Sequence, residues 1–184
     1  MTSPPSQQPT ILAFDTSAAH VAAALLLGGQ IVVQRHEEMA RGQAERLFPL
    51  LEEMLAEHGA VWEELDAIGV GVGPGNFTGI RIAVSAARGL AMSLGIPAIG
   101  VTGFEVMRGP NSMSDLSRQV VSLPGPRDGV YLQQFENAEA TGSPLYFDMD
   151  GYEKVGSLGD LNGIEVLGHR AYELAFWQSP HHDA

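Results

Sequence analysis

Residues 73–81 read Gly-Pro-Gly-Asn-Phe-Thr-Gly-Ile-Arg and stand between two apolar segments of different length. The preceding segment, Ala67 to Val72, has the length of a buried strand, and the following segment, Ile80 to Leu94, has the length of a helix. The stretch is therefore predicted to form a strand–loop–helix turn. Its glycines permit positive φ angles and close backbone approach, and Thr78 is placed to cap the helix.

Two roles are open for this turn. Backbone N–H groups at a helix N-terminus suit an anion such as phosphate. Alternatively, the glycines only allow two elements to pack closely. The spacing matches neither standard phosphate motif, because Thr78 stands where the dinucleotide fingerprint has glycine and no Gly-Lys-Ser/Thr follows.

Three apolar runs at the start of the chain predict three strands, Thr10 to Phe14, Val21 to Leu27 and Gln30 to Arg35. Gly28-Gly29 lies between the last two runs and is a two-residue hairpin signal. At least this pair of strands is therefore expected to be antiparallel.

The segment from Gln43 to Glu57 is predicted to be an amphipathic helix that Gly59 ends. Pro49 lies inside the pattern, where it should kink the helix or mark a shifted start. The apolar residues at spacings of three and four are Ala44, Leu47, Phe48, Leu51, Met54 and Leu55.

The later part of the chain is less regular. Gly95 is a natural C-cap for the helix that precedes it, and Ala98 to Val101 predicts a strand. The remaining elements that we expect are a loop at Gly109 to Asp115, strands at Gln119 to Leu123, Val130 to Phe135, Leu145 to Phe147 and Ile164 to Leu167, and a short helix at Arg170 to Trp177.

Three meander strands followed by helix, strand, helix and strand is the order of a ribonuclease-H-like lobe, as in the actin-like ATPases (the ASKHA fold). We therefore expect an α/β protein with one complete lobe and one reduced lobe. The expected divisions are a disordered tail at residues 1–9, an N-terminal actin-like lobe at 10–107 and a reduced C-terminal lobe at 108–184.

Composition narrows the classes of function. A formal net charge of −12 disfavours direct binding to a nucleic-acid backbone, so we expect the chain to bind nucleic acid only where a partner supplies the positive charge. The absence of cysteine excludes disulfides and thiolate metal sites. No apolar run approaches the ~20 residues of a membrane helix, and the polar start lacks the features of a secretory signal. We therefore expect a cytoplasmic protein without membrane contact.

Candidates for catalysis are few. Asp15-Thr16-Ser17 lies at the first hairpin turn, where actin-like ATPases place a phosphate-contacting acid, although these residue types favour any turn. No zincin helix and no Gly-x-Ser-x-Gly elbow occurs. We expect no catalytic residue, no metal and no cofactor. The histidines considered and set aside as ligands are His20, His36, His58, His169, His181 and His182.

The helix predicted at Ile80 to Leu94 is apolar around most of its circumference, so it must be covered on both sides. One side packs on the sheet. The other side either meets a partner or is covered entirely by the helix at Gln43 to Glu57, which itself has apolar residues beyond one stripe, with Leu50 beside Leu51.

Residues 73–81 closely resemble the signature of the TsaB (YeaZ) family, whose usual form has Ser where Asn76 stands. The resemblance extends over about residues 10–107. The other segments that carry it are Ile-Leu-Ala-Phe-Asp-Thr-Ser at 11–17, Glu-Arg-Leu-Phe-Pro at 45–49, Leu-Asp-Ala-Ile at 65–68 and Gly-Ile-Pro-Ala-Ile-Gly-Val at 95–101.

This resemblance implies a non-catalytic scaffold in the formation of N6-threonylcarbamoyladenosine on tRNA. The expected partners are a TsaD-like paralogue, which carries the chemistry, and a small TsaE-like ATPase. The family's second-lobe strand ends in Asp, and Pro124 stands there in this chain, so a nucleotide site is not expected.

By position in the two interface helices, the resemblance implies a partner interface that contains Phe48, Leu51, Leu55, Ile80, Val84, Ala87 and Ala91. A charge at Ala87 is then expected to separate the complex. Two other functions stay open. One is a free-standing ATP-dependent phosphotransferase or hydrolase that uses Asp15 and the glycine turn, and the other is a homodimeric interaction module.

Overall fold

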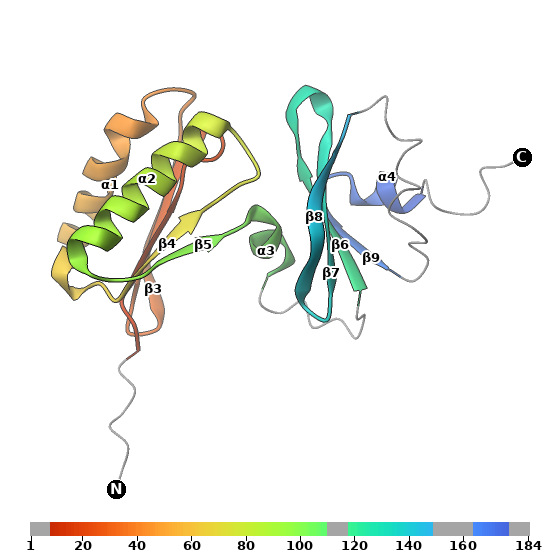
Figure 1. Ribbon diagram of the computed structural model, residues 1–184. Helices are drawn as coiled ribbons and strands as arrows, with labels where there is room; N and C mark the ends of the chain where they lie inside the picture. Colours follow the sequence, from red (N-terminus) through yellow and green to blue (C-terminus); the bar gives the residue numbers. More distant parts are fainter. Residues whose placement is uncertain (1–7, 110–117, 149–163, 177–184) are drawn as a thin grey trace, which may run out of the picture. The chain divides into compact units, whose positions relative to one another are not determined.

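The computed structural model describes residues 8–109, 118–148 and 164–176 of the 184-residue chain, which divides into two units, Met1–Thr102 and Gly103–Ala184. Figure 1 shows the elements of each unit. The first unit contains β1 (Ile11–Asp15), β2 (His20–Leu27), β3 (Gln30–Glu38), α1 (Gln43–Glu57), a 3-10 turn (Trp62–Glu64), β4 (Ala67–Gly71), α2 (Phe77–Leu94) and β5 (Ala98–Val101).

The first unit is built on a five-stranded sheet of order β3-β2-β1-β4-β5. β1 pairs antiparallel with β2 and parallel with β4, and β4 pairs parallel with β5. The β2–β3 hairpin turns at Gly28 and Gly29, both with positive φ, as their sequence predicts. This is the strand order expected of a ribonuclease-H-like lobe.

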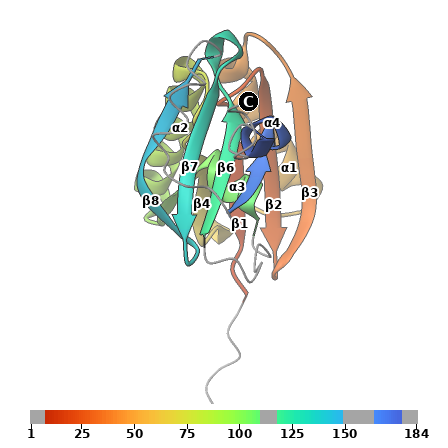
Figure 2. The same ribbon diagram turned by 90° about the vertical axis from the view of Figure 1, so that its right-hand side faces the viewer.

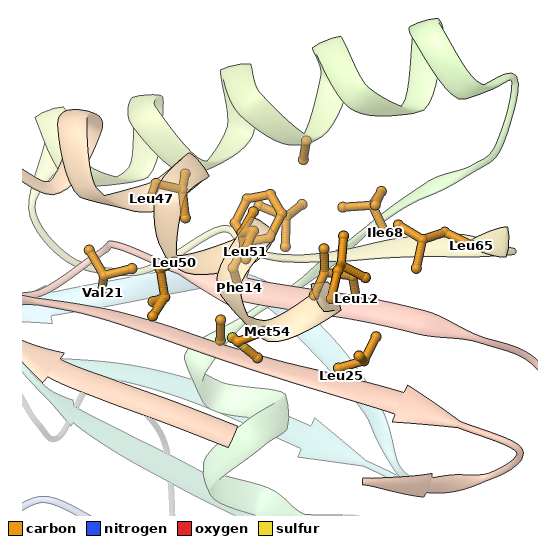
Figure 3. Packing of buried hydrophobic residues seen from close by; sticks show 14 of the residues in the cluster. Leu12, Phe14, Val21, Leu25, Leu47, Leu50, Leu51, Met54, Leu65 and Ile68 are labelled. Atoms are coloured by element: carbon orange, nitrogen blue, oxygen red, sulfur yellow. The ribbon is translucent and has the colours of Figure 1, made fainter. Parts of the chain in front are cut away.

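The core of the first unit lies between the sheet and the two helices, which cover the same face of the sheet (Figure 1). Alternate residues of β1 and β2 point into it because side chains on a strand alternate between faces. Figure 3 shows that the buried face of α1 meets these strand residues. The labelled core residues are Leu12, Phe14, Val21, Leu25, Leu47, Leu50, Leu51, Met54, Leu65 and Ile68.

Three local predictions need correction. The cap of α2 is Asn76 and not Thr78, and the helix consequently begins at Phe77 rather than at Ile80. β3 continues to Glu38 because an edge strand can carry polar residues that still pair with β2. α1 runs without interruption through Pro49, whose ring lies on an exposed part of the helix.

The second unit contains α3 (Gly103–Arg108), β6 (Arg118–Pro124), a 3-10 turn (Pro126–Asp128), β7 (Val130–Glu136), β8 (Glu139–Phe147), β9 (Glu165–Gly168) and α4 (Ala171–Phe176). Its sheet has the order β8-β7-β6-β9, and Figure 2 shows these strands side by side with α4 over β9. The sequence pattern missed α3, because six residues are too few to display a helical period. The expected positions 110–115 and Trp177 lie outside the described residues.

The sheet of the second unit has apolar clusters on both faces. Val120, Val130 and Leu132 pack toward α4, whereas Val121 and Phe135 pack with Phe104 of α3. β6 is therefore buried on both faces from Gln119 to Leu123, a stretch that includes the polar Gln119 and Ser122.

Candidate functional site

The turn after β1 is held by the side chain of Asp15. Its Oδ1 accepts hydrogen bonds from the backbone N–H of Ser17 at 2.9 Å and from the Ser17 hydroxyl at 2.8 Å. The His20 Nε2 atom lies 3.0 Å from the same oxygen. The imidazole of His36 lies beside that of His20, with the ring centroids 4.8 Å apart and the ring planes inclined at 49°. Asp15 thus fixes the first turn.

The glycine turn packs against the same segment. The Thr16 hydroxyl donates to the carbonyl oxygen of Gly79 at 2.6 Å, and the Asn76 N–H donates to the carbonyl oxygen of Ser17 at 2.6 Å. A Cβ added at Gly79 would lie 1.8 Å from the Thr16 carbonyl oxygen, and one added at Gly75 would lie 2.3 Å from that of Ser17. The glycines therefore permit close packing between two turns, the second of the two roles that the sequence left open.

Three N–H groups at the start of α2, those of Thr78, Gly79 and Ile80, already have acceptors. The side-chain oxygen of Asn76 accepts from Thr78 N at 2.9 Å and from Gly79 N at 3.1 Å, and the Asn76 carbonyl accepts from Ile80 N. These groups are among the donors that a bound anion would use. An anion at this terminus would have to displace a cap that the chain supplies itself.

An apolar groove of about 450 Å³ lies between α1 and α2, where the two helices leave their outer edges uncovered. On the α2 side, the small residues Ser85, Gly89 and Ser93 recur at intervals of four, so they lie along one edge of the helix. Phe48 on α1 is 41% exposed beside it. The complete lining is Ala44, Leu47, Phe48, Ile82, Ser85, Ala86, Gly89, Leu90 and Ser93.

The seven residues expected at a partner interface have different surroundings. Phe48 lines the groove, and Ile80, Val84 and Ala91 are half-buried. The other three, Leu51, Leu55 and Ala87, are buried within the unit, so their side chains support the two helices from beneath. The expectation that Ala87 faces outward is wrong, because it lies on the α2 face that packs on the sheet.

The groove residues of α2 that sequence reasoning missed are Ile82, Ser85, Ala86, Gly89, Leu90 and Ser93. The feature of the sequence that indicates this edge of α2 is the i, i+4, i+8 spacing of Ser85, Gly89 and Ser93. Small residues at that spacing can mark a close helix contact as well as a buried face.

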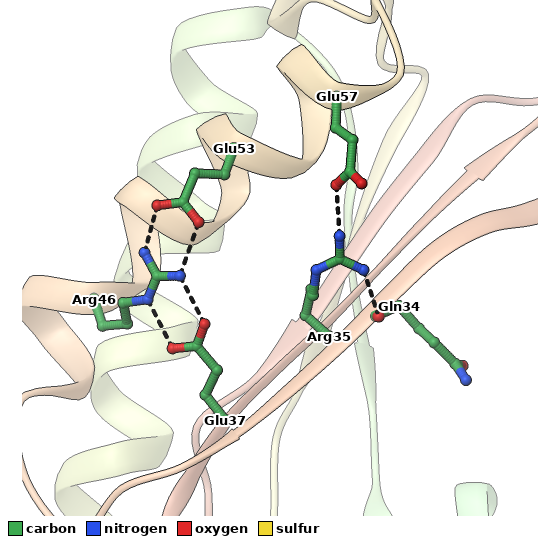
Figure 4. Close-up of polar contacts among 6 residues, drawn as sticks. All are labelled: Gln34, Arg35, Glu37, Arg46, Glu53 and Glu57. Atoms are coloured by element: carbon green, nitrogen blue, oxygen red, sulfur yellow. Dashed lines mark hydrogen bonds and ion pairs between the residues drawn. The ribbon is translucent and has the colours of Figure 1, made fainter.

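The side of α1 away from the groove is fastened to edge strand β3 by ion pairs (Figure 4). The Arg46 guanidinium donates two hydrogen bonds to Glu37, at 2.6 and 2.7 Å, and two to Glu53, at 2.7 and 2.8 Å. Arg35 of β3 also pairs with Glu57 near the end of α1.

The same hydrogen bonds from Arg46 lower the pKa of Glu37 and of Glu53 below the ordinary value of 4.5. They also raise the pKa of the Arg46 guanidinium. The network keeps α1 in one position on the sheet, and α1 forms one wall of the groove.

In the second unit, Pro124 ends β6 and a tight turn follows. Arg127 and Asp128 have positive φ angles of 53° and 60°, and the Asp128 carboxylate pairs with Arg170 at 3.2 Å. Pro124 stands where the resemblance to the family leads us to expect an aspartate. The acidic residue nearest to it in the sequence is Asp128, and its carboxylate is engaged by Arg170.

Within residues 8–109, 118–148 and 164–176, no three His, Asp or Glu side chains gather as metal ligands would. Two of the histidines considered from the sequence, His181 and His182, lie outside these ranges. The helices in the same ranges also include none that is both long and apolar enough to cross a membrane.

Comparison with known proteins gives a consistent family. Residues 31–162 match the family described as TsaD: tRNA N6-adenosine threonylcarbamoyltransferase. The chain is 31% identical over 129 residues to the tRNA threonylcarbamoyladenosine biosynthesis protein TsaB of Haemophilus influenzae, covering 70% of this chain and 54% of that protein. It is 30% identical over 131 residues to TsaB of Escherichia coli, covering 70% of this chain and 56% of that protein. The chain thus spans about half the length of the curated relatives it matches.

Solved structures agree with these relatives. YeaZ from Pseudomonas aeruginosa has a TM-score of 0.64 at 30% identity and covers 76% of this chain and 68% of its own. A ROK family protein from Streptococcus pneumoniae has a TM-score of 0.50 at 15% identity and covers 73% and 48%, so it shares the fold alone. The fold is the mixed α/β, ribonuclease-H-like and actin-like one that the strand order predicts. From its sequence, its strand order and these relatives, the chain belongs to the TsaB (YeaZ) family.

Proposed function

We propose that this chain is a non-catalytic docking subunit in the formation of N6-threonylcarbamoyladenosine on tRNA. Two TsaB relatives at 30 and 31% identity are named for the biosynthesis of this nucleoside. The observation that carries the proposal is the groove between α1 and α2, which is apolar and open. No residue of the turn at Asp15 lines it. A surface of this kind usually receives another protein.

The proposed occupant is a TsaD-like paralogue, which would supply the transferase chemistry. Phe48 and the half-buried Ile80, Val84 and Ala91 would contribute to the contact, and Leu51, Leu55 and Ala87 would support it from within the unit. A TsaE-like ATPase would join this complex, and tRNA would be bound by the complex and not by this acidic chain alone. The proposed location is the cytoplasm.

The lack of independent catalysis is supported by three features. The glycine turn is packed against Thr16 and Ser17, the N-terminus of α2 is capped by Asn76, and Pro124 stands at the end of β6. None of these arrangements favours the free-standing phosphotransferase.

Ser85→Glu tests the docking proposal. Ser85 is exposed and lines the groove, so the substitution leaves the core intact and places a carboxylate where a partner would exclude water. Loss of hydration should weaken binding to the TsaD-like protein of the same organism by about a hundredfold. Co-purified proteins or calorimetry would measure it.

Gln30→Glu is the matched control, since it adds a carboxylate at an exposed end of edge strand β3, away from the groove. Binding that survives Ser85→Glu as well as it survives Gln30→Glu would contradict the proposed docking face. Ala87→Glu is unsuitable for this purpose, because a charge at a fully buried position would unfold the unit.

A further inference from the structure

Two histidines that are distant in the sequence lie side by side on the sheet of the first unit. His20 is the first residue of β2, His36 lies near the end of β3, and their ring centroids are 4.8 Å apart. β2 and β3 are antiparallel with Ala22 opposite His36, so the two histidines are diagonal neighbours. They meet only because the β2–β3 hairpin closes, and for this reason their spacing in the sequence does not connect them.

Both rings lie on the face of the sheet that α1 and α2 leave uncovered. Val21 and Ala23 of β2 are buried in the core beneath the helices, so His20 and Ala22, which alternate with them, belong to the opposite face. His36 shares this face because it is paired with Ala22. The histidine pair and the groove between the helices are therefore on different sides of the sheet.

Asp15 holds one of the two rings in place. Its Oδ1 atom lies 3.0 Å from Nε2 of His20. Because a carboxylate only accepts hydrogen bonds, the proton of a neutral His20 ring lies on Nε2 and the lone pair lies on Nδ1. Among the residues that the structure describes, none forms a hydrogen bond with Nδ1 of His20 or with either ring nitrogen of His36. A carboxylate behind a histidine is the arrangement that orients histidine ligands in metal sites.

The separation of the rings fits two ligands of one ion. Zn²⁺ binds an imidazole nitrogen at about 2.0–2.1 Å and then lies about 3.2 Å from the ring centre. Two rings that bind the same ion at an angle of about 90–110° therefore have centroids about 4.5–5.2 Å apart. The observed 4.8 Å falls in this range, and ring planes inclined at 49° are not stacked in parallel. Glu38 is opposite His20 in the strand register, so the surroundings are acidic and favour a cation.

We propose that His20 and His36 bind one divalent transition-metal ion of the class that prefers imidazole ligands, such as Zn²⁺ or Cu²⁺. Asp15 is a positioning residue that holds His20 and does not itself bind the ion. Water occupies the other coordination positions, since no third His, Asp or Glu among the described residues gathers there as a ligand. Mg²⁺ prefers carboxylate oxygens to nitrogen, so it is not the ion of this site.

The ion would join the start of β2 to the end of β3, where the chain leaves the sheet for α1. Through Asp15 it would also hold the turn at Ser17, against which the glycine turn packs. An ion that binds only the folded unit raises the stability of that unit. Docking of a TsaD-like protein uses the other side of the sheet, so this proposal stands or fails independently of the proposed function.

Metal binding is measured on the full chain by isothermal titration calorimetry. All samples carry H181A/H182A, because two adjacent histidines can bind a transition metal by themselves. We expect one Zn²⁺ per chain, a melting temperature that rises with Zn²⁺ concentration, and no effect of Mg²⁺. Cu²⁺ should bind more tightly than Zn²⁺, and its electron paramagnetic resonance spectrum should show coupling to two nitrogen atoms.

His36→Ala is the decisive variant. His36 is exposed and its removal leaves the contact between Asp15 and His20 in place, so the unit should stay folded. The variant should bind Zn²⁺ at least about tenfold more weakly and lose the metal-dependent rise in melting temperature. His58→Ala is the matched control, because it removes another exposed histidine of the same unit, and it should leave binding unchanged.

Asp15→Asn tests the positioning role. The amide keeps an acceptor for His20 and removes the charge, so affinity for Zn²⁺ should fall about tenfold. The spectrum of bound Cu²⁺ should still show two nitrogen atoms, which distinguishes a residue that orients a ligand from a ligand itself.

The absence of saturable binding of both Zn²⁺ and Cu²⁺ would overturn the proposal. So would binding that His36→Ala leaves unchanged, or an equal loss in His36→Ala and His58→Ala, which would show adventitious binding to surface histidines. Binding of Mg²⁺ that depends on Asp15 and not on His36 would indicate a carboxylate site in its place. Melting curves recorded without metal verify that each variant is folded.

Discussion

At the scale of single residues, two glycines of α2 have opposite roles. Gly79 lies in the first turn of the helix, with its carbonyl bound to the Thr16 hydroxyl and no room for a Cβ. Gly89 lies in the middle of the helix, where an added Cβ meets nothing within 4 Å. The first glycine is required for folding, and the second costs the helix stability because glycine in a helix interior is unfavourable.

Gly79→Ala should therefore destabilise the first unit by about 3 kcal/mol or more, since the clash is with backbone atoms that cannot rotate away. Gly89→Ala should stabilise it by roughly 0.5–1 kcal/mol through helix propensity. Chemical denaturation followed by circular dichroism measures both. Equal effects of the same sign would contradict the assignment of the two positions.

Asn76 shows a second role for a single side chain in the glycine turn. Its oxygen accepts from the N–H groups of Thr78 and Gly79 and so satisfies two of the donors at the start of α2. Asn76→Ala should cost about 1 kcal/mol, the usual value of a lost N-cap, whereas Asn76→Ser should cost less because serine also caps well. A melting temperature that is lowered equally by both substitutions would contradict the capping role.

At the scale of elements, α1 depends on its contacts with β3. Pro49 removes one N–H donor from the middle of the helix, so the carbonyl four residues earlier loses its helical partner. The pair between Arg46 and Glu53 spans this turn, and the pair between Arg46 and Glu37 joins the helix to the sheet. The arginine thus holds the helix on both sides of the proline.

This network predicts a pH dependence of unfolding. The pKa values of Glu37 and Glu53 are lower in the folded state than their ordinary value of 4.5, because Arg46 hydrogen-bonds their charged forms. The unfolded chain therefore binds more protons as pH falls below that value. The contribution to stability is present above about pH 4.5 and is lost as pH falls through the lowered pKa values.

Arg46→Gln should remove this contribution, so the melting temperature of the variant should fall less steeply than that of the native chain between pH 5 and pH 3. Arg88→Gln, which removes the charge of an exposed arginine on α2, serves as the control. Parallel curves for the native chain and Arg46→Gln would show that the network contributes nothing in solution.

At the scale of the whole molecule, charge determines what the chain can bind unaided. A net charge of −12 opposes the release of counterions from a phosphate backbone, and the ten basic residues include Arg35, Arg46 and Arg170, which are paired internally. The purified chain should show no submicromolar binding to tRNA at physiological salt in a gel shift. Tight binding without partners would contradict the docking function.

The arrangement around Asp15 leads to a related expectation for nucleotide chemistry. Asp15 Oδ1 is engaged by Ser17 and His20, and the glycine turn is packed on the same segment. The purified chain should therefore hydrolyse no ATP at a rate above that of Asp15→Ala. ATP turnover by the native chain that disappears in Asp15→Ala would instead support the alternative of a free-standing phosphotransferase or hydrolase. The melting curve of Asp15→Ala checks that the turn survives the substitution.

Much of this architecture follows from local patterns. The hairpin at Gly28-Gly29, the bounds of α1, the end of α2 at Gly95 and the strand Ala98–Val101 agree with the sequence because each depends on neighbouring residues and on the periods of strand and helix. The sequence does not predict α3, because six residues are too few to display a helical period. It favours Thr78 over Asn76 as the cap, because it does not show which polar side chain turns back toward the helix.

The candidate site likewise has one part that the sequence predicts and one part that only the tertiary structure decides. The apolar character of α2 is a property of its sequence, and it suffices to predict that two sides are covered. Which residues face the sheet and which face the groove depends on how α2 is rotated against β4 and how close α1 lies, and both are decided by packing between segments distant in sequence. For this reason Ala87 is in the core, whereas Ser85 and Gly89 line the groove.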